Sequence, residues 1–274
     1  MAALNSLPIV LNTTTIAYTT AHEAYGLLST ELERFIGLVE TLGPEDWGKP
    51  TACSAWNVRD ILAHQAGGYA SGASYMELIH QYGRIPKLGQ LPEDAINEVQ
   101  LSERSGKSPA ELIAELRTVG PIAAQKWSYH FRLLKLLSIP HRTAGSLSLR
   151  HLMWVIHSRD TWMHRLDICR STGRKFEQTA EHDGRIAELV MLDVAKSLTR
   201  QLDGKSIAFN LAGIAGGNWK IGNSEPAATI QMDVLDFNIF ASGRYTYEQA
   251  RPLATIAGNI ELAERALKGL LILF

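Results

Sequence analysis

The amino-acid sequence predicts an α+β protein with a long helical N-terminal part and a short sheet-containing C-terminal part. Between about residues 20 and 204, apolar residues recur at spacings of three and four, as they do on the buried face of amphipathic helices. After Gly204 the segments become short, β-prone and separated by glycine and asparagine, as strands are. Two further helical patterns close the chain.

No helix or strand is predicted for the first residues of the chain. No charged side chain precedes Glu23, whereas a secretory signal needs a basic region and a longer apolar run. We therefore expect residues 1–19 to form an irregular lead-in rather than a signal. The sequence also lacks an apolar run long enough for a transmembrane helix.

Composition narrows the classes of function. The 274 residues carry a net charge of -1, so no excess of positive charge favours nucleic-acid binding. Two cysteines are too few for a disulfide framework and suit a reduced, cytoplasmic protein. We expect a small-molecule partner, no nucleic acid and no membrane, and either a monomer or a homodimer.

The first two helices have clear end signals. The first is expected over residues 20–42, where Gly43 and Pro44 end it. A loop follows, and Asn57 then has the character of an N-cap, with Asp60 three residues on as a variant of the capping box. The helix that Asn57 opens is expected to run to about Gly83.

The middle of the chain is predicted to be helical to residue 137, with breaks near 105–109 and at Gly120-Pro121. A long helix should then run from about Ser148 to Thr172, ended by Gly173. One more helix over residues 179–204 completes a helical domain expected to cover residues 20–204.

The C-terminal domain, residues 205–274, is predicted to hold three strands and two helices. The strands are expected at 205–213, 218–222 and 227–233, and the helices around 235–243 and 259–271. The apolar end of the chain is too short to span a membrane, so we expect it to be buried in a core or in an oligomer interface.

One face of the long helix gathers ionisable residues. At 100° per residue, His157, Asp160 and His164 fall within a sector of about 60°. Asp160 and His164 are one turn apart, so their side chains can converge on one ion. An imidazole and a carboxylate suit zinc or another borderline divalent metal. A polar face opposite an apolar stripe also fits a solvent-exposed helix, and this helix alone does not separate the two interpretations.

A third ligand has to come from elsewhere in the chain, since two residues rarely complete a metal site. His64 lies beside the apolar stripe of the second helix and is the candidate. The alternative is a surface histidine next to glycines that allow close helix packing.

Two stretches together resemble a known family. The stretch "TACSAWNVRDILAHQAGG" and the stretch "RDTWMHRLDICRSTGR" resemble the two N-terminal signatures of the mycothiol-dependent maleylpyruvate isomerase family, a branch of the DinB-like metal-binding proteins. The later "WKIGNSEPAATIQMD", "ASGR" and "AGNIELAERAL" resemble the sterol-carrier-like C-terminal domain of that family. The resemblance covers roughly residues 20–274.

The resemblance implies a DinB-like up-down four-helix bundle followed by a small α+β domain. It also implies a divalent metal, usually zinc, held at one end of the bundle by His64, Asp160 and His164. The better-known acid at the second place is glutamate. The shorter Asp160 would draw the metal toward its helix or reach it through water, and His157 could support or share its role.

The activity that the resemblance implies uses a low-molecular-weight thiol, such as mycothiol, as cosubstrate. A metal favours the thiolate form of a bound thiol, and a thiolate attacks electron-poor carbon. Attack on a conjugated double bond leads to cis–trans isomerisation, whereas loss of a leaving group gives thiol transfer. The alternative is a metal- or ligand-binding module of the same superfamily without turnover.

Weaker signals concern residues outside the expected ligand set. Arg244 matches a position near the domain junction of the family and could clamp a substrate carboxylate. Trp56 and Trp162 are expected to be core aromatics. Neither Cys53 nor Cys169 is needed as a nucleophile. We expect Arg59 with Asp60, and Arg165 with Asp167, to form structural pairs.

Overall fold

The computed structural model describes residues 10–84, 92–141, 143 and 145–274 of the chain. Its contacts divide the chain into two compact units. One is helical and comprises Thr19–Phe176 with Phe274; the other joins the residues before Thr19 to Glu177–Leu273 and contains the sheet. The predicted α+β class is confirmed, with a helical N-terminal region and a sheet-containing C-terminal part.

The boundary differs from the expected one near residue 204. Helix α8 (His182–Leu198) belongs to the sheet-containing unit, where it packs on strand β5 and helix α9. An amphipathic pattern marks α8 as a helix but does not say which core receives its apolar face. The sequence therefore predicted the helix and assigned it to the other domain.

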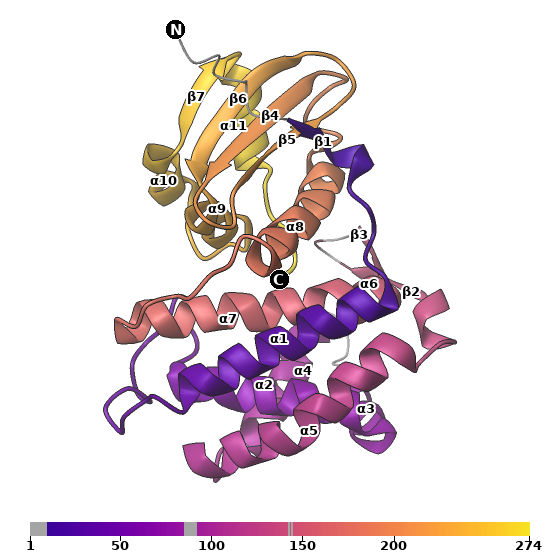
Figure 1. The fold of residues 1–274 in the computed structure, drawn as a ribbon, viewed down its shortest axis with the longest axis vertical. Coiled ribbons are helices and arrows are strands. Elements are labelled where there is room, and N and C mark those ends of the chain that lie inside the picture. The colour runs from indigo at the N-terminus through magenta and orange to yellow at the C-terminus, as the bar shows by residue number, and fades with distance from the viewer. Residues whose placement is uncertain (1–9, 85–91, 142, 144) are drawn as a thin grey trace, which may run out of the picture. The chain divides into compact units, whose positions relative to one another are not determined.

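Four long helices of the helical unit pack on one another, α1 on α5 and α7, and α2 on α5 and α7 (Figure 1). Their apolar faces share one buried core that includes Phe35, Leu62 and Trp127. The helices of this unit are α1 (Ala21–Val39), α2 (Val58–Ala73), α3 (Tyr75–Tyr82), α4 (Pro92–Glu103), α5 (Pro109–Tyr129), α6 (Leu149–His151) and α7 (His157–Thr172).

The predicted helix start at Asn57 and the predicted helix end at Gly173 are confirmed. Thr20 and Asn57 each begin a helix with a capping box, since the side chain accepts from the backbone of the third residue, whose carboxylate accepts in return. Gly173 ends α7 in the left-handed conformation, with φ at 72°.

Two predicted boundaries were wrong. Helix α5 continues through Pro121, where a break was expected. Gly120 there lets α5 approach α1 closely, because an added Cβ would lie 2.5 Å from Cδ2 of Leu32. The single helix expected over residues 58–83 is divided at Ser74, which ends α2 and accepts from Glu77 to begin α3.

Segments between the long helices hold elements that the sequence did not predict. Strands β2 (Ser138–His141) and β3 (Gly145–Ser148) form an antiparallel hairpin. A π-helical turn, Leu152–Ile156, joins α6 to α7.

The sheet-containing unit holds five strands in the order β1-β5-β4-β6-β7. Strands β4 and β6 are parallel, and β5 and β7 run antiparallel to them. The three predicted strands are confirmed. The elements are β1 (Leu11–Asn12), β4 (Ser206–Ala212), β5 (Gly217–Ile221), β6 (Pro226–Asp233), β7 (Thr255–Gly258), α8, α9 (Val234–Ala241), α10 (Tyr247–Ala250) and α11 (Ile260–Lys268).

The two ends of the chain contribute to this unit. Leu11 and Asn12, in the expected irregular lead-in, pair in parallel with β5. Near the other end, Leu270 and Ile272 are buried and the backbone N–H of Ile272 donates to the carbonyl of Ala241. None of the helices in the described residues is long and apolar enough to cross a membrane.

Candidate metal centre

Helix α2 presents His64 from a fixed start. The side chain of Asn57 accepts from the backbone N–H of Asp60, and the Asp60 carboxylate accepts from the backbone N–H of Asn57. This reciprocal pair fixes where the helix begins, about two turns before His64. The imidazole of His64 is half-buried.

Helix α7 presents Asp160 and His164 one turn apart. Oδ1 of Asp160 lies 3.3 Å from Nε2 of His164. His164 and Asp167 are buried, and Asp160 is half-buried. This burial removes the interpretation of the polar face of α7 as a simple solvent-exposed face.

The structure brings together the three residues that the family resemblance implied as ligands. His64 Nε2 lies 3.4 Å from the second oxygen of Asp160, Oδ2. The ligand atoms of His64, Asp160 and His164 all lie within 4.8 Å of one another. Two imidazoles and a carboxylate, drawn from two helices, form a donor set suited to a borderline divalent cation.

Each histidine is held through its other ring nitrogen. His164 Nδ1 lies 3.1 Å from Oδ2 of Asp167, and His64 Nδ1 lies 2.8 Å from Oε1 of Gln100. A carboxylate oxygen and an amide oxygen accept hydrogen bonds and do not donate them, so each Nδ1 carries the proton. Each Nε2 is left facing Asp160, which is the arrangement of metal-binding histidines with supporting acceptors.

A buried group of polar side chains holds Asp160 in turn. Gln65 donates from Nε2 to Oδ2 of Asp160 at 2.6 Å, and its Oε1 lies 2.9 Å from the hydroxyl of Thr161. The Thr161 hydroxyl also lies 3.1 Å from that of Tyr69. These contacts help to fix the direction of the carboxylate.

The charges of Asp160 and His164 depend on each other. Burial favours the neutral carboxyl, but the facing imidazoles of His164 and His64 hold the pKa of Asp160 well below its usual value. Burial likewise opposes the charged imidazole, but Asp160, with support from Asp167 and Cys53, raises the pKa of His164 well above its usual value. Without an ion, the centre thus balances its carboxylate with a proton on His164.

Trp56 lies over both imidazoles. Its ring centroid is 4.8 Å from that of His64 and 5.6 Å from that of His164. Trp56 also lines a hollow of about 350 Å³ at the surface, with five residues of α4: Asp94, Asn97, Glu98, Leu101 and Ser102. The expected core role of Trp162 is confirmed by its complete burial, whereas Trp56 is half-buried beside the centre.

His157 shares the polar face of α7 but packs elsewhere. Its ring stacks on Trp127, with centroids 3.8 Å apart and planes inclined by 13°. Burial lowers the pKa of His157 to about 4, against the attraction of Asp160. A supporting or shared role for His157 at the metal stays a prediction.

The arginines of the two predicted charge pairs have partners that the sequence did not indicate. Arg59 donates to the backbone carbonyls of Arg104, Ser105 and Lys107. Arg165 donates to the buried carboxylate of Glu31 at 3.0 and 3.1 Å. The pairing of Arg59 with Asp60, and of Arg165 with Asp167, stays a prediction.

Four contributors to the site were given no role there by the sequence. Gln100 lies in no quoted motif, Gln65 and Cys53 lie in the first signature without an assigned role at the site, and Asp167 was assigned to a charge pair. Cys53 donates from its thiol to Oδ2 of Asp167 at 3.6 Å, behind His164. Only Asp167 could have been found, because it follows His164 by three residues on the same helix.

Arg244 lies in the sheet-containing unit, after α9. Its backbone N–H donates to the carbonyl of Ile239, and its side chain is half-buried. Its role as a carboxylate clamp stays a prediction.

Comparisons with known proteins find one family model and two solved structures to which this chain is similar. The model of the mycothiol maleylpyruvate isomerase N-terminal domain matches residues 28–169. The fold is similar to a crystal structure of the mycothiol-dependent maleylpyruvate isomerase, with 15% identity and a TM-score of 0.54, and to one of a histidine-to-alanine mutant, with 14% and 0.56. Each alignment covers 89% of this chain and 98% of the other. No curated protein matches the sequence.

Proposed function

The chain belongs to the mycothiol maleylpyruvate isomerase N-terminal domain family, and from this premise we propose that it is a metal- and thiol-dependent enzyme. Its thiol is a low-molecular-weight one such as mycothiol, and its substrate is a small electrophile. The observation that carries the proposal is the convergence of His64, Asp160 and His164 within 4.8 Å.

The donor set fits a divalent cation, with zinc as the first choice. Both imidazoles direct Nε2 at one carboxylate, and both Nδ1 atoms are occupied by acceptors. A cation among these atoms would take the place of the proton that now balances Asp160. When bound, such a metal stabilises the thiolate form of a thiol at neutral pH.

The residues of the chain would divide the work. His64, Asp160 and His164 hold the ion, and three protein ligands leave a position open for the thiol, as in catalytic zinc sites. Gln65 keeps Asp160 aimed, and Trp56 covers the two imidazoles from the side of the hollow. Arg244 is proposed to bind a substrate carboxylate bidentately.

The proposed reaction needs no net consumption of thiol. The thiolate adds to a conjugated double bond, the adduct rotates about the single bond so formed, and elimination restores both the double bond and the thiolate. With a leaving group on the substrate, the same attack would end in thiol transfer. A reducing compartment such as the cytoplasm suits this thiol and the two free cysteines.

Metal analysis and a thiol-dependent assay test the proposal together. Purified protein should hold about one divalent ion per chain, and His64→Ala and His164→Ala should lose it. Conversion of maleylpyruvate, followed by ultraviolet absorbance, should require both the metal and mycothiol. Absence of metal, with no response of the melting temperature to zinc, would contradict the proposal. A bound metal without turnover would favour the binding-module alternative.

A further inference from the structure

We infer that Gln100 and Gln81 are positioning residues that keep the proton of His64 on Nδ1 and leave Nε2 open to a metal. This role deepens the proposed function and rests on it, because the open Nε2 matters only if a metal binds there. The protonation of Nδ1 itself can be measured without any metal.

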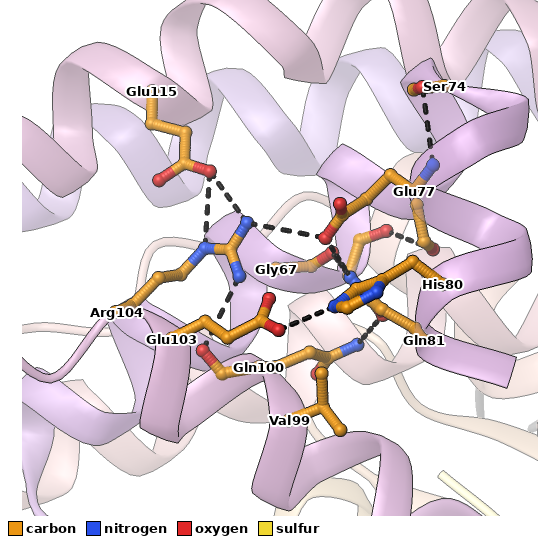
Figure 2. A network of polar contacts seen from close by, with 12 residues as sticks. Gly67, Ser74, Glu77, His80, Gln81, Val99, Gln100, Glu103, Arg104 and Glu115 are labelled. Atoms are coloured by element: carbon orange, nitrogen blue, oxygen red, sulfur yellow. Dashed lines mark hydrogen bonds and ion pairs between the residues drawn. The ribbon is translucent and has the colours of Figure 1, made fainter. Parts of the chain in front are cut away.

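A chain of hydrogen bonds, which we call the relay, leaves helix α2 at His64, passes through Gln100 and Gln81, and returns to α2 at Gly67. His64 Nδ1 contacts Oε1 of Gln100 at 2.8 Å, and Gln100 Nε2 donates to Oε1 of Gln81 at 2.8 Å. Gln81 Nε2 donates to the carbonyl of Gly67 at 2.9 Å and to Oε1 of Glu77 at 2.8 Å. Figure 2 shows the Gln81 amide between Gly67, Glu77 and Gln100.

The direction of every bond in this relay follows from its far end. The Gly67 carbonyl and the Glu77 carboxylate accept only, so the NH₂ group of Gln81 must face them. The oxygen of Gln81 then faces Gln100 and requires the NH₂ group of Gln100. The oxygen of Gln100 is left for His64, and this oxygen requires a proton on Nδ1.

The relay has little freedom to reverse. Gln81 is fully buried and Gln100 is 3% exposed. A reversed amide would therefore place buried donors against donors and buried acceptors against acceptors. Arg104 holds the backbone of α4 in place, donating to the carbonyl of Gln100 at 3.4 Å and to Glu115 at 2.7 Å (Figure 2).

A reversed relay would close the site. The NH₂ group of Gln100 would then face Nδ1, the proton would move to Nε2, and Nε2 would donate to Asp160. His64 and Asp160 already lie 3.4 Å apart, so that bond would need little movement. The orientation of the Gln100 and Gln81 amides thus decides whether His64 can bind a metal or forms a hydrogen-bonded pair with Asp160.

The first measurement is the ¹⁵N spectrum of the His64 ring in the metal-free full-length protein. In the wild type the neutral ring should carry its proton on Nδ1. In Gln100→Met, which keeps the length of the side chain and removes both polar ends, the proton should move to Nε2. An unprotonated Nδ1 in the wild type would overturn the inference.

The second measurement is the affinity for Zn²⁺. Gln100→Met should bind zinc roughly 10–100-fold more weakly, as changes of a supporting residue typically do. Gln100→Glu keeps an acceptor for Nδ1 but sets its other oxygen against Oε1 of Gln81, so it should bind zinc more tightly than Gln100→Met without reaching the affinity of the wild type. A purely structural role predicts the reverse order, because Met suits a buried site and an added charge does not.

Two neighbouring glycines offer a matched pair of variants. A Cβ at Gly67 would lie 2.6 Å from Cγ of Gln100, whereas a Cβ at Gly68 meets nothing within 4 Å. Gly67→Ala should therefore displace Gln100 and weaken zinc binding, and Gly68→Ala should leave it unchanged. Equal affinities of the two variants would contradict the inference.

Failure of the relay and failure of the proposed function give different results. If the wild type binds no Zn²⁺, the proposed function fails and the ring spectrum alone decides the inference. If the wild type binds Zn²⁺ and Gln100→Met binds it equally well with Nδ1 still protonated, the relay is disproved and the metal centre stands.

Discussion

His164 and His64 occupy equivalent places about Asp160, yet the protein supports them in opposite ways. His164 is buried and contacts the Asp167 carboxylate on its own helix. His64 is half-buried and contacts a neutral amide on another helix. A charged support makes an imidazole more basic, whereas a neutral one fixes its direction without adding charge. At the centre, His164 is therefore supported by a charge, whereas His64 is held in its direction by a neutral hydrogen bond.

The largest test of this difference removes each histidine in turn. Both His164→Ala and His64→Ala should weaken zinc binding by more than the roughly 100-fold expected of a supporting residue. Only His164→Ala should also destabilise the metal-free protein strongly, by about 3 kcal/mol, because it removes the imidazole that contacts the carboxylates of both Asp160 and Asp167. Urea denaturation gives the free energies, and equal losses in the two variants would refute the asymmetry.

Removing the charge behind His164 should have the next largest effect. Asp167→Asn keeps an acceptor near Nδ1 but removes the negative charge, so zinc affinity should fall roughly 10–100-fold. The pKa of His164 should fall as well, which an NMR titration of the ring would show. An unchanged pKa would mean that Asp160 alone sets the basicity of His164.

His157 is a third histidine near the site and lies on α7 with His164. The attraction of Asp160 does not offset the effect of burial on the pKa of His157. Its pKa is lowered from 6.5 to about 4, so it folds as the neutral form. Stability linked to His157 is present above the unfolded value and is lost as the pH falls from about 6.5 toward 4. The loss should reach about 3 kcal/mol once the pH falls below both values.

His157→Phe, which can keep the stack on Trp127, should remove that part of the acid sensitivity. Denaturation midpoints measured at pH 7 and pH 4.5 provide the comparison. If the variant loses as much stability as the wild type over this range, the acid-sensitive group lies elsewhere.

The smallest effect should come from the start of α2. Asn57→Ala removes the cap that fixes where α2 begins and should cost about 1 kcal/mol of stability. Zinc affinity should change by less than a few fold, because the relay holds His64 independently. A large loss of affinity would show that the cap, and not Gln100, sets the direction of His64.

The sequence predicted the features that depend on residues close together in the chain, and it missed those that depend on distant residues. The capping residue of α2 and the glycine at the end of α7 act within a few positions, so Asn57 and Gly173 predicted helix ends correctly. The three residues implied as ligands could be named because a family pattern places them, and the structure brings them together. Their role as ligands stays a prediction.

The missed features depend on contacts between distant parts of the chain. Gln100 meets His64 only because α4 packs on α2, and nothing about a glutamine in a helix announces such a contact. Pro121 was read as a helix break because local chemistry favours one, and the close approach of Gly120 to Leu32 has no local sign. The same reason explains α8, whose apolar face does not reveal its partner.

The return of the relay to the helix where it starts has a thermodynamic consequence. Coupling between two equilibria is reciprocal, so if the docking of α3 and α4 on α2 prepares His64 for an ion, an ion on His64 stabilises that docking by the same free energy. Amide hydrogens in α4 should then exchange with solvent more slowly once zinc is present. Hydrogen exchange in α4, the helix that lines the hollow beside Trp56, would thus show whether a metal ion is bound at the site.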